Sequence, residues 1–524
     1  MSQLRSISRL TSLNIGNAFI GMANSVAMAW LFGTSDRMQS YFAAATLLTI
    51  VQRVFFVGQF SEMFLPEYVQ RREVDGQLKA DRCFSALYNH LILMLILTMA
   101  AAFVVMPWVG GIIAPGFTRD EQHQVVRLAQ ALMVVMLLVV ANGHLQIIGN
   151  ARGWYGRFEF YGLVGSAVGF GLLLITGRTL GIWALVVSQG VTQVVLLWGS
   201  WRYLYRQGYR HAWIWNEPGF SVWRVVGRVG LTAIYVLATQ FYVVAFNASL
   251  TFLPPGTLAV YKYAENLYSR VGTLFMRPVG VVFFTDAALL AHRNPSQLRE
   301  RMSNALYHYA LMYLGVLVVL FPALPNVLGV LWGSPRYHLA EIQLTTVFAW
   351  FFFGMLIVEG GGLLYRRLNV IMGDMRLHYA LMTVVQAAMA VVAPMMVRHW
   401  GVLGAALVLI VNITCLALAG FLIILWRRPQ YLAFFPAATW KLAATALPAL
   451  GVAWLMRHAW PILNYQGDYS LMGKFGELAC AALFAGTGLI TAAAVAWILG
   501  VEEARVAWHK MRGWRITLRV SHPV

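Results

Sequence analysis

Long uninterrupted runs of apolar residues are the feature that most constrains how this chain folds. Each run is close to the roughly 20 residues that an α-helix needs to cross the ~30 Å hydrocarbon core of a bilayer. Since only 11% of the 524 residues are charged and 60% are hydrophobic, the chain lacks the polar surface of a soluble protein. The sequence predicts an all-α, polytopic membrane protein of about 14 transmembrane helices, with spans at 11–32, 39–65, 84–113, 125–148, 159–177, 180–201, 225–250, 257–290, 304–332, 342–364, 379–397, 401–425, 438–456 and 476–499.

Basic residues alternate between the connections of these spans. Of the 39 Lys and Arg residues, 27 lie in the terminal segments and in every second connection, where Arg228 and Lys441, in the first four residues of the following span, are counted with the connection; five others lie within spans. The remaining connections hold only seven, namely Arg37, Arg119, Arg178, Arg336, Arg398, Arg457 and Lys474. Lys and Arg concentrate in cytoplasmic loops, so we expect both termini and the basic loops to lie in the cytoplasm. The loops also account for the net charge of +19, and no nucleic-acid partner is expected.

The spans divide into two sets of six and a final pair. The predicted organisation is an N-terminal lobe at 1–224, a C-terminal lobe at 225–428, an additional helix pair at 429–500 and a basic cytoplasmic tail at 501–524. The tail contains Trp508, Trp514 and five basic residues. We expect it either to lie as an amphipathic segment on anionic lipids of the cytoplasmic face or to be a disordered basic tail.

Patterns typical of enzymes and cofactor sites are absent from the sequence. There is no phosphate-binding Gly-rich loop with a lysine, no zinc-ligand pair on a helix and no nucleophile elbow. Cys83, Cys415 and Cys480 are far apart and have no metal-ligand spacing. We therefore expect transport instead of catalysis, without a cofactor or a metal.

Three arginines inside predicted spans are candidate substrate-binding residues. Arg53 lies in span 39–65, and Arg270 and Arg277 lie seven residues apart on one face of span 257–290. A charge in the bilayer is costly unless it faces a partner or a wet cavity, and guanidinium groups match the oxygens of phosphate. These arginines are predicted to bind a multiply charged anion; the alternative is that they form interfacial or structural ion pairs.

Further polar residues of the spans are predicted to line a cavity or to couple transport to an ion. They are Gln52, Gln59, Glu62, Lys262, Glu265 and Glu359. Lys262 and Glu265 are three residues apart, a spacing that equally suits a structural ion pair. Glu359 lies in a glycine-rich stretch of span 342–364, where it is predicted either to couple transport or to line a hinge.

Four local patterns go beyond composition. They are A-W-L-F-G at 29–33, F-F-V-G-Q-F-S-E-M-F-L-P at 55–66, P-W-V followed by A-P-G-F within 107–117, and Y-A-E-N-L at 263–267. Together they resemble the MurJ (MviN) family of flippases, part of the multidrug/oligosaccharidyl-lipid/polysaccharide exporter superfamily. The resemblance implies two six-helix lobes, a terminal helix pair and a central cavity with alternating access. It also implies a location in the bacterial inner membrane and an undecaprenyl-pyrophosphate-linked saccharide as cargo, with its pyrophosphate held by cations.

Several positions that are typically charged in that family are uncharged here, namely Ala18, Asn24, Gln39, Gln52, Val57 and Asn266. The scaffold thus resembles the family while the substrate-facing chemistry differs. We expect a flippase for an exopolysaccharide or other surface glycan, with polysaccharide-synthesis proteins as candidate partners. The alternative within the family is a lipid II flippase that serves peptidoglycan synthesis and its cell-wall proteins. A multidrug or organic-cation exporter and a membrane-embedded glycan-polymerising enzyme are the alternatives of other classes.

Overall fold

Helices make up the fold throughout the described chain. The computed structural model describes residues 2–54, 57–152, 154, 156–290, 295–436 and 438–501. The helices are α1 (Ser2–Phe32), α2 (Asp36–Val54), α3 (Val57–Val74), α4 (Gln77–Ile113), α5 (Arg119–Ala151), α6 (Arg157–Thr176), α7 (Trp183–Arg206), α8 (Val222–Leu250), α9 (Thr257–Leu290), α10 (Pro295–Gly315), the π-helix η1 (Val316–Leu320), α11 (Phe321–Trp332), α12 (Leu339–Gly354), α13 (Leu356–Ile371), α14 (Met375–Arg427), α15 (Thr439–Ala459) and α16 (Leu471–Ile498), with short 3-10 helices at Pro429–Tyr431 and Pro461–Leu463. Within these ranges no strand forms, and the two isolated bridges, Glu217–Phe220 and Ser334–Tyr337, lie in connections. The predicted all-α class is confirmed.

Each predicted span corresponds to one helix, to consecutive helices or to part of a helix. The span at 39–65 covers α2 and α3, η1 joins α10 to α11, and α12 with α13 forms another span. α14 holds the two spans at 379–397 and 401–425, which are separated by a kink at Gly401. The φ of 56° at Gly401 lies in the left-handed region that glycine adopts without strain. Counted this way, the described helices form the predicted fourteen spans.

Ten of the described segments are long and apolar enough to cross a membrane by length and composition alone. α14 is one of these ten and contains two predicted spans. The three spans outside the ten are α2 with α3, α9 and α15. Two of them, α2 with α3 and α9, carry eight of the nine predicted site residues.

Two compact units make up the chain. The first comprises residues 1–263 and 379–408, and the second comprises 264–378 and 409–524. The division into lobes at 1–224 and 225–428, a helix pair at 429–500 and a tail at 501–524 stays a prediction. Residues 502–524, and with them the tail's amphipathic character, lie outside the described residues.

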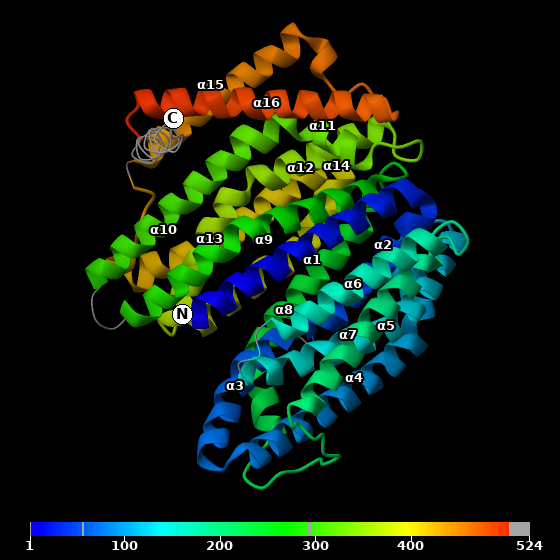
Figure 1. Ribbon diagram of the computed structural model, residues 1–524, viewed down its shortest axis with the longest axis vertical. Coiled ribbons are helices and arrows are strands. Elements are labelled where there is room, and N and C mark those ends of the chain that lie inside the picture. Colours follow the sequence, from blue (N-terminus) through cyan, green and yellow to red (C-terminus); the bar gives the residue numbers. More distant parts are fainter. Residues whose placement is uncertain are drawn as a thin grey trace, which may run out of the picture. The chain divides into compact units, whose positions relative to one another are not determined.

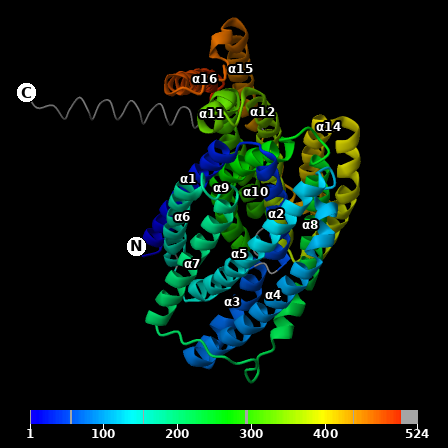
Figure 2. The same cartoon turned by 90° about the vertical axis from the view of Figure 1, so that its right-hand side faces the viewer.

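In the first unit, α5 is the central helix. It contacts α2, α3, α4 and α7, while α6 packs on α7 and α1 (Figures 1 and 2). In the second unit, α16 packs on α11 and α15 (Figure 1). Glu477 on α16, 6% exposed, accepts a hydrogen bond from Asn326 Nδ2 on α11 at 2.6 Å. This contact ties the last predicted helix pair to α11.

A buried polar network joins α3, α4 and the connection after α5. Arg152 forms an ion pair with Asp81, and the two side chains are 8% and 10% exposed. The Asp81 carboxylate also accepts hydrogen bonds from Tyr68 Oη and Gln77 Nε2, both at 2.8 Å. Arg152 Nε donates to Tyr68 Oη at 3.2 Å. Every charge in this network has a partner, which is the condition for burying an ion pair without a large penalty.

The connection 207–221 is held against α4 by His211. Asn89 Nδ2 donates to the carbonyl oxygens of Ala212 and Ile214, so Asn89 Oδ1 accepts from His211 Nε2 at 2.9 Å. His211 Nδ1 then accepts from Tyr209 Oη at 3.1 Å. These bonds fit the neutral imidazole, and partial burial lowers the pKa of His211 below its ordinary value.

We expect acidification to loosen this connection. Because the pKa of His211 is lower in the folded chain than in the unfolded chain, the stability it contributes is present above its ordinary pKa and is lost as the pH falls. Hydrogen-exchange protection of 207–221 should fall between about pH 7.5 and about pH 5.5. A His211→Gln variant, which does not titrate, should show a smaller fall; an equal fall in both proteins would contradict this role.

Candidate functional site

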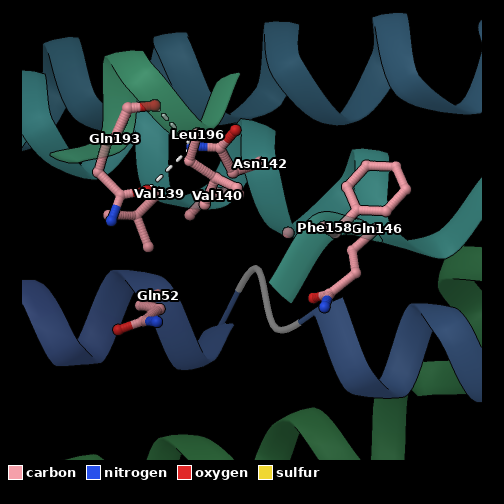
Figure 3. A pocket seen from close by; sticks show the side chains of 9 residues that line it. Gln52, Val139, Val140, Asn142, Gln146, Phe158, Gln193 and Leu196 are labelled. Atoms are coloured by element: carbon pink, nitrogen blue, oxygen red, sulfur yellow. Dashed lines mark hydrogen bonds between the residues drawn. The ribbon is translucent and has the colours of Figure 1, made fainter. Parts of the chain in front are cut away.

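A polar cavity of about 300 Å³ lies between α2, α5, α6 and α7 of the first unit. Figure 3 shows Gln52 on α2 across the cavity from Asn142 and Gln193, while Gln146 extends from α5 toward the side where α2 lies. The lining residues are Gln52, Val139, Val140, Asn142, Gly143, Gln146, Phe158, Gln193 and Leu196. The cavity therefore combines four amide side chains with an apolar wall.

Hydrogen bonds fix the orientation of three of these amides. Asn142 Nδ2 donates to Gln193 O at 3.0 Å and to Gln193 Oε1 at 2.9 Å (Figure 3). Gln146 Nε2 donates to Glu159 Oε1 at 3.0 Å, and the Glu159 carbonyl accepts from Asn17 Nδ2 at 3.5 Å. Asn142 is 5% exposed, and its Oδ1 has no hydrogen-bond partner in the described chain. The amides are thus held at fixed angles around the cavity.

Two of the predicted site residues, Gln52 and Arg53, lie on α2. Gln52 lines the cavity, and Gln52 and Arg53 are both exposed. Gln59 and Glu62 belong to α3, but their side chains lie outside the described part of the structure. Their predicted roles stay predictions.

The predicted residues of α9 differ in their surroundings. Lys262 is half-buried, with its ammonium 5.4 Å from the centroid of the Tyr261 ring, and Arg270 is exposed. Glu265 is half-buried, and its pairing with Lys262 stays a prediction. The Arg277 side chain lies outside the described residues. Lys262 belongs to the first unit, and Glu265 and Arg270 belong to the second.

Glu359 lies in the first turn of α13, five residues after α12 ends at Gly354. One carboxylate oxygen, Oε2, is buried and has no hydrogen-bond partner among the described residues. The next turn packs tightly, because a Cβ on Gly362 would lie 2.8 Å from Ala417. The structure therefore places Glu359 at a helix break inside the second unit, and its coupling role stays a prediction.

The sequence pattern did not single out Asn142, Gln146 and Gln193 as site residues. An amide in an apolar span is commonly a residue that hydrogen-bonds between helices, so its presence alone does not mark a binding site. One signal was present, since Asn142 and Gln146 are four residues apart and therefore share a face of α5. In the described ranges no group of three or more His, Cys, Asp or Glu side chains comes together as a metal site would require.

The sequence patterns at 29–33, 107–117 and 263–267 have architectural roles. A Cβ on Gly116 would lie 2.1 Å from the carbonyl oxygen of Thr251, so only glycine fits this approach of the loop to the end of α8. Gly116 N also donates to Thr251 Oγ1 at 3.0 Å. Tyr263, fully buried, donates through its hydroxyl to Gly33 O at 3.2 Å. These residues hold helix ends together within the first unit.

Comparison with known proteins identifies a family. The model of the family described as lipid II flippase MurJ matches residues 28–472. A protein named probable lipid II flippase MurJ from Buchnera aphidicola subsp. Baizongia pistaciae is 21% identical over 332 residues, which cover 61% of this chain and 62% of that protein. Its namesake from Rhizobium tropici is 26% identical over 308 residues, which cover 55% of each chain. The matches thus span less than two thirds of these relatives' lengths.

Solved structures show the same fold. The lipid II flippase MurJ in an inward closed conformation matches with a TM-score of 0.75 over 94% of this chain and 99% of that chain, at 13% identity. An inward-facing multidrug resistance MATE transporter of the MOP superfamily matches with a TM-score of 0.61 over 81% of this chain and 98% of that chain, at 16% identity. With a family match that extends over most of its length, this multi-pass membrane protein belongs to the MurJ family.

Proposed function

We propose that this protein is a flippase that moves lipid II from the inner to the outer leaflet of the bacterial cytoplasmic membrane. The observation that carries the proposal is the family match over residues 28–472. The names of the relatives favour lipid II over the exopolysaccharide cargo that the sequence alone suggested. In this proposal the protein is a transporter and not an enzyme, and both of its termini lie in the cytoplasm.

The chemistry of the exposed cations supports a pyrophosphate-linked cargo. The guanidinium groups of Arg53 and Arg270 are exposed on helices of the fold, and such groups bind phosphate oxygens through charge-assisted hydrogen bonds. Arg53 belongs to the first unit and Arg270 to the second. Arg277, on the same predicted face as Arg270, is a third candidate.

A second candidate cargo is the lipid-linked repeat unit of an exopolysaccharide or other surface glycan. The observation that favours it is the set of uncharged residues at positions typically charged in the family, which are Ala18, Asn24, Gln39, Gln52, Val57 and Asn266. A different saccharide would need a different set of contacts, while its pyrophosphate would still need cations.

Complementation distinguishes the two cargoes. We expect the chain, expressed in bacteria depleted of their lipid II flippase, to restore growth and the appearance of lipid II in the outer leaflet. The matched control is the same chain with Arg53 and Arg270 both replaced by alanine, at equal protein level in the membrane. Failure of the wild-type chain to rescue, together with loss of surface glycan when its own gene is deleted, would favour the exopolysaccharide cargo.

A further inference from the structure

The amide-lined cavity of the first unit has a composition that suits a neutral ligand. Its lining contains four amides and no ionisable side chain. Glu159 is directed to Gln146 by a hydrogen bond and is not part of the lining. An anion would need basic side chains and a metal cation would need carboxylates, so the cavity suits neither.

The hydrogen bonds already made determine what the cavity offers to a ligand. Asn142 Nδ2 is used by Gln193, and Asn142 Oδ1 is buried with no partner among the described residues. Gln193 accepts through Oε1, so its Nε2 is left to donate. Gln146 Nε2 is used by Glu159, so Gln146 Oε1 is left to accept. A group with hydroxyls, which both donate and accept, satisfies this mixed set.

Burial makes such a ligand energetically reasonable. A polar atom that is buried in a membrane protein without a hydrogen-bond partner destabilises the folded state, so such atoms are rare and usually have a specific reason. Asn142 Oδ1 is such an atom within the described chain. Val139, Val140, Leu196 and Phe158 supply apolar surface for the C–H faces of a sugar ring. The volume of about 300 Å³ is at the lower limit of ligand pockets, which fits one saccharide unit better than a whole oligosaccharide.

The cavity also adjoins a predicted phosphate-binding residue. Gln52 lines it, and Arg53 follows on the same helix. Consecutive helical residues have Cα atoms ~3.8 Å apart and project about 100° apart. A glycosyl pyrophosphate has the same adjacency, because its first sugar is bonded directly to a phosphate.

We infer that this cavity binds the saccharide unit next to the pyrophosphate of the lipid-linked substrate, through Gln52, Asn142, Gln146 and Gln193. The inference rests on the proposed function and adds to it a specificity site within a single unit. Arg53 binds the pyrophosphate, which all these lipid-linked substrates share. The amides distinguish a lipid pyrophosphate that carries a sugar from one that does not.

The experiment compares two ligands in nanodiscs, lipid II and undecaprenyl pyrophosphate, which lacks a saccharide. We expect Gln193→Leu and Gln52→Leu each to weaken the affinity for lipid II about tenfold, the effect of losing about one hydrogen bond. Their affinity for undecaprenyl pyrophosphate should be unchanged, whereas Arg53→Ala should weaken both. Leucine is close to glutamine in volume, and the exposed Gln52 makes no hydrogen bond to a described residue, so Gln52→Leu tests the cavity even if Gln193→Leu fails to fold.

Gln130→Leu is the matched control. Gln130 lies on α5, as Gln146 does, and donates to Phe103 O at 3.3 Å away from the cavity. The Gln130→Leu variant should bind both ligands with the affinity of the wild-type protein. Equal weakening for both ligands, or no weakening for lipid II, in the cavity variants would overturn the saccharide site alone. If the wild-type protein bound neither ligand, the proposed function would fail and the saccharide site with it.

Discussion

Alanine at Arg53 or at Arg270 is expected to reduce transport of a lipid-linked saccharide by roughly ten- to a hundredfold. A hydrogen bond to a charged group contributes about 1.5–3 kcal/mol, and every 1.4 kcal/mol is about tenfold in affinity. The loss should be greatest when Arg53, Arg270 and Arg277 are all replaced. Lysine at these positions should retain part of the activity, because it keeps the charge and loses the two-pronged geometry of the guanidinium.

The assay is translocation of fluorescent lipid II in proteoliposomes at matched protein content. Arg127→Ala is the control, since Arg127 is exposed near the start of α5. It should transport as the wild-type protein does. Unchanged transport in the Arg53→Ala and Arg270→Ala variants would remove these residues from the substrate site.

Alanine at Asp81 is expected to destabilise the protein by about 3–5 kcal/mol, the cost of removing one partner of a buried ion pair. The substitution leaves the Arg152 guanidinium, 8% exposed, without its counter-ion, and leaves Tyr68 and Gln77 without their acceptor. Thermal unfolding in detergent should show a clearly lower midpoint. In a double-mutant cycle, Asp81→Ala combined with Arg152→Ala should cost less than the sum of the single changes.

Asp75→Ala is the matched control for this effect. Asp75 pairs with Lys79 at 3.8 Å, and these side chains are 35% and 60% exposed. Exposed pairs of this kind contribute about 0–1 kcal/mol, so the midpoint should barely move. Equal shifts for Asp75→Ala and Asp81→Ala would show that burial of the Asp81 pair adds nothing to stability.

Much of the architecture could be predicted because a bilayer leaves few solutions. Backbone groups in hydrocarbon must be paired internally, so each apolar run of sufficient length becomes a helix. The limits of α9 and the end of α4 were predicted to the residue. Which side chains of different helices pair with each other was not predictable. The ion pair between Asp81 and Arg152, which are 71 residues apart, leaves no local pattern in the sequence.

The candidate site divides in the same way. Arg53, Arg270 and Glu359 could be singled out because a charge in an apolar run is conspicuous and costly. Asn142, Gln146 and Gln193 could not be singled out, because amides are common in such runs. Only the residues that an amide faces in the folded protein show whether it belongs to a site. Gln52 was singled out as a polar residue of its span, and the structure adds that it faces these amides across a cavity.

The apolar runs of the sequence were enough to determine an all-α membrane protein of fourteen spans, because the length of a run and the thickness of a bilayer decide that question locally. The four sequence patterns were enough to indicate the family that the comparison then identified. Tertiary structure alone decided that Gly116 and Tyr263 hold helix ends together and that four amides from three helices meet around one cavity. These outcomes depend on which faces of distant helices pack together, and that choice is made by the summed contacts of the whole unit.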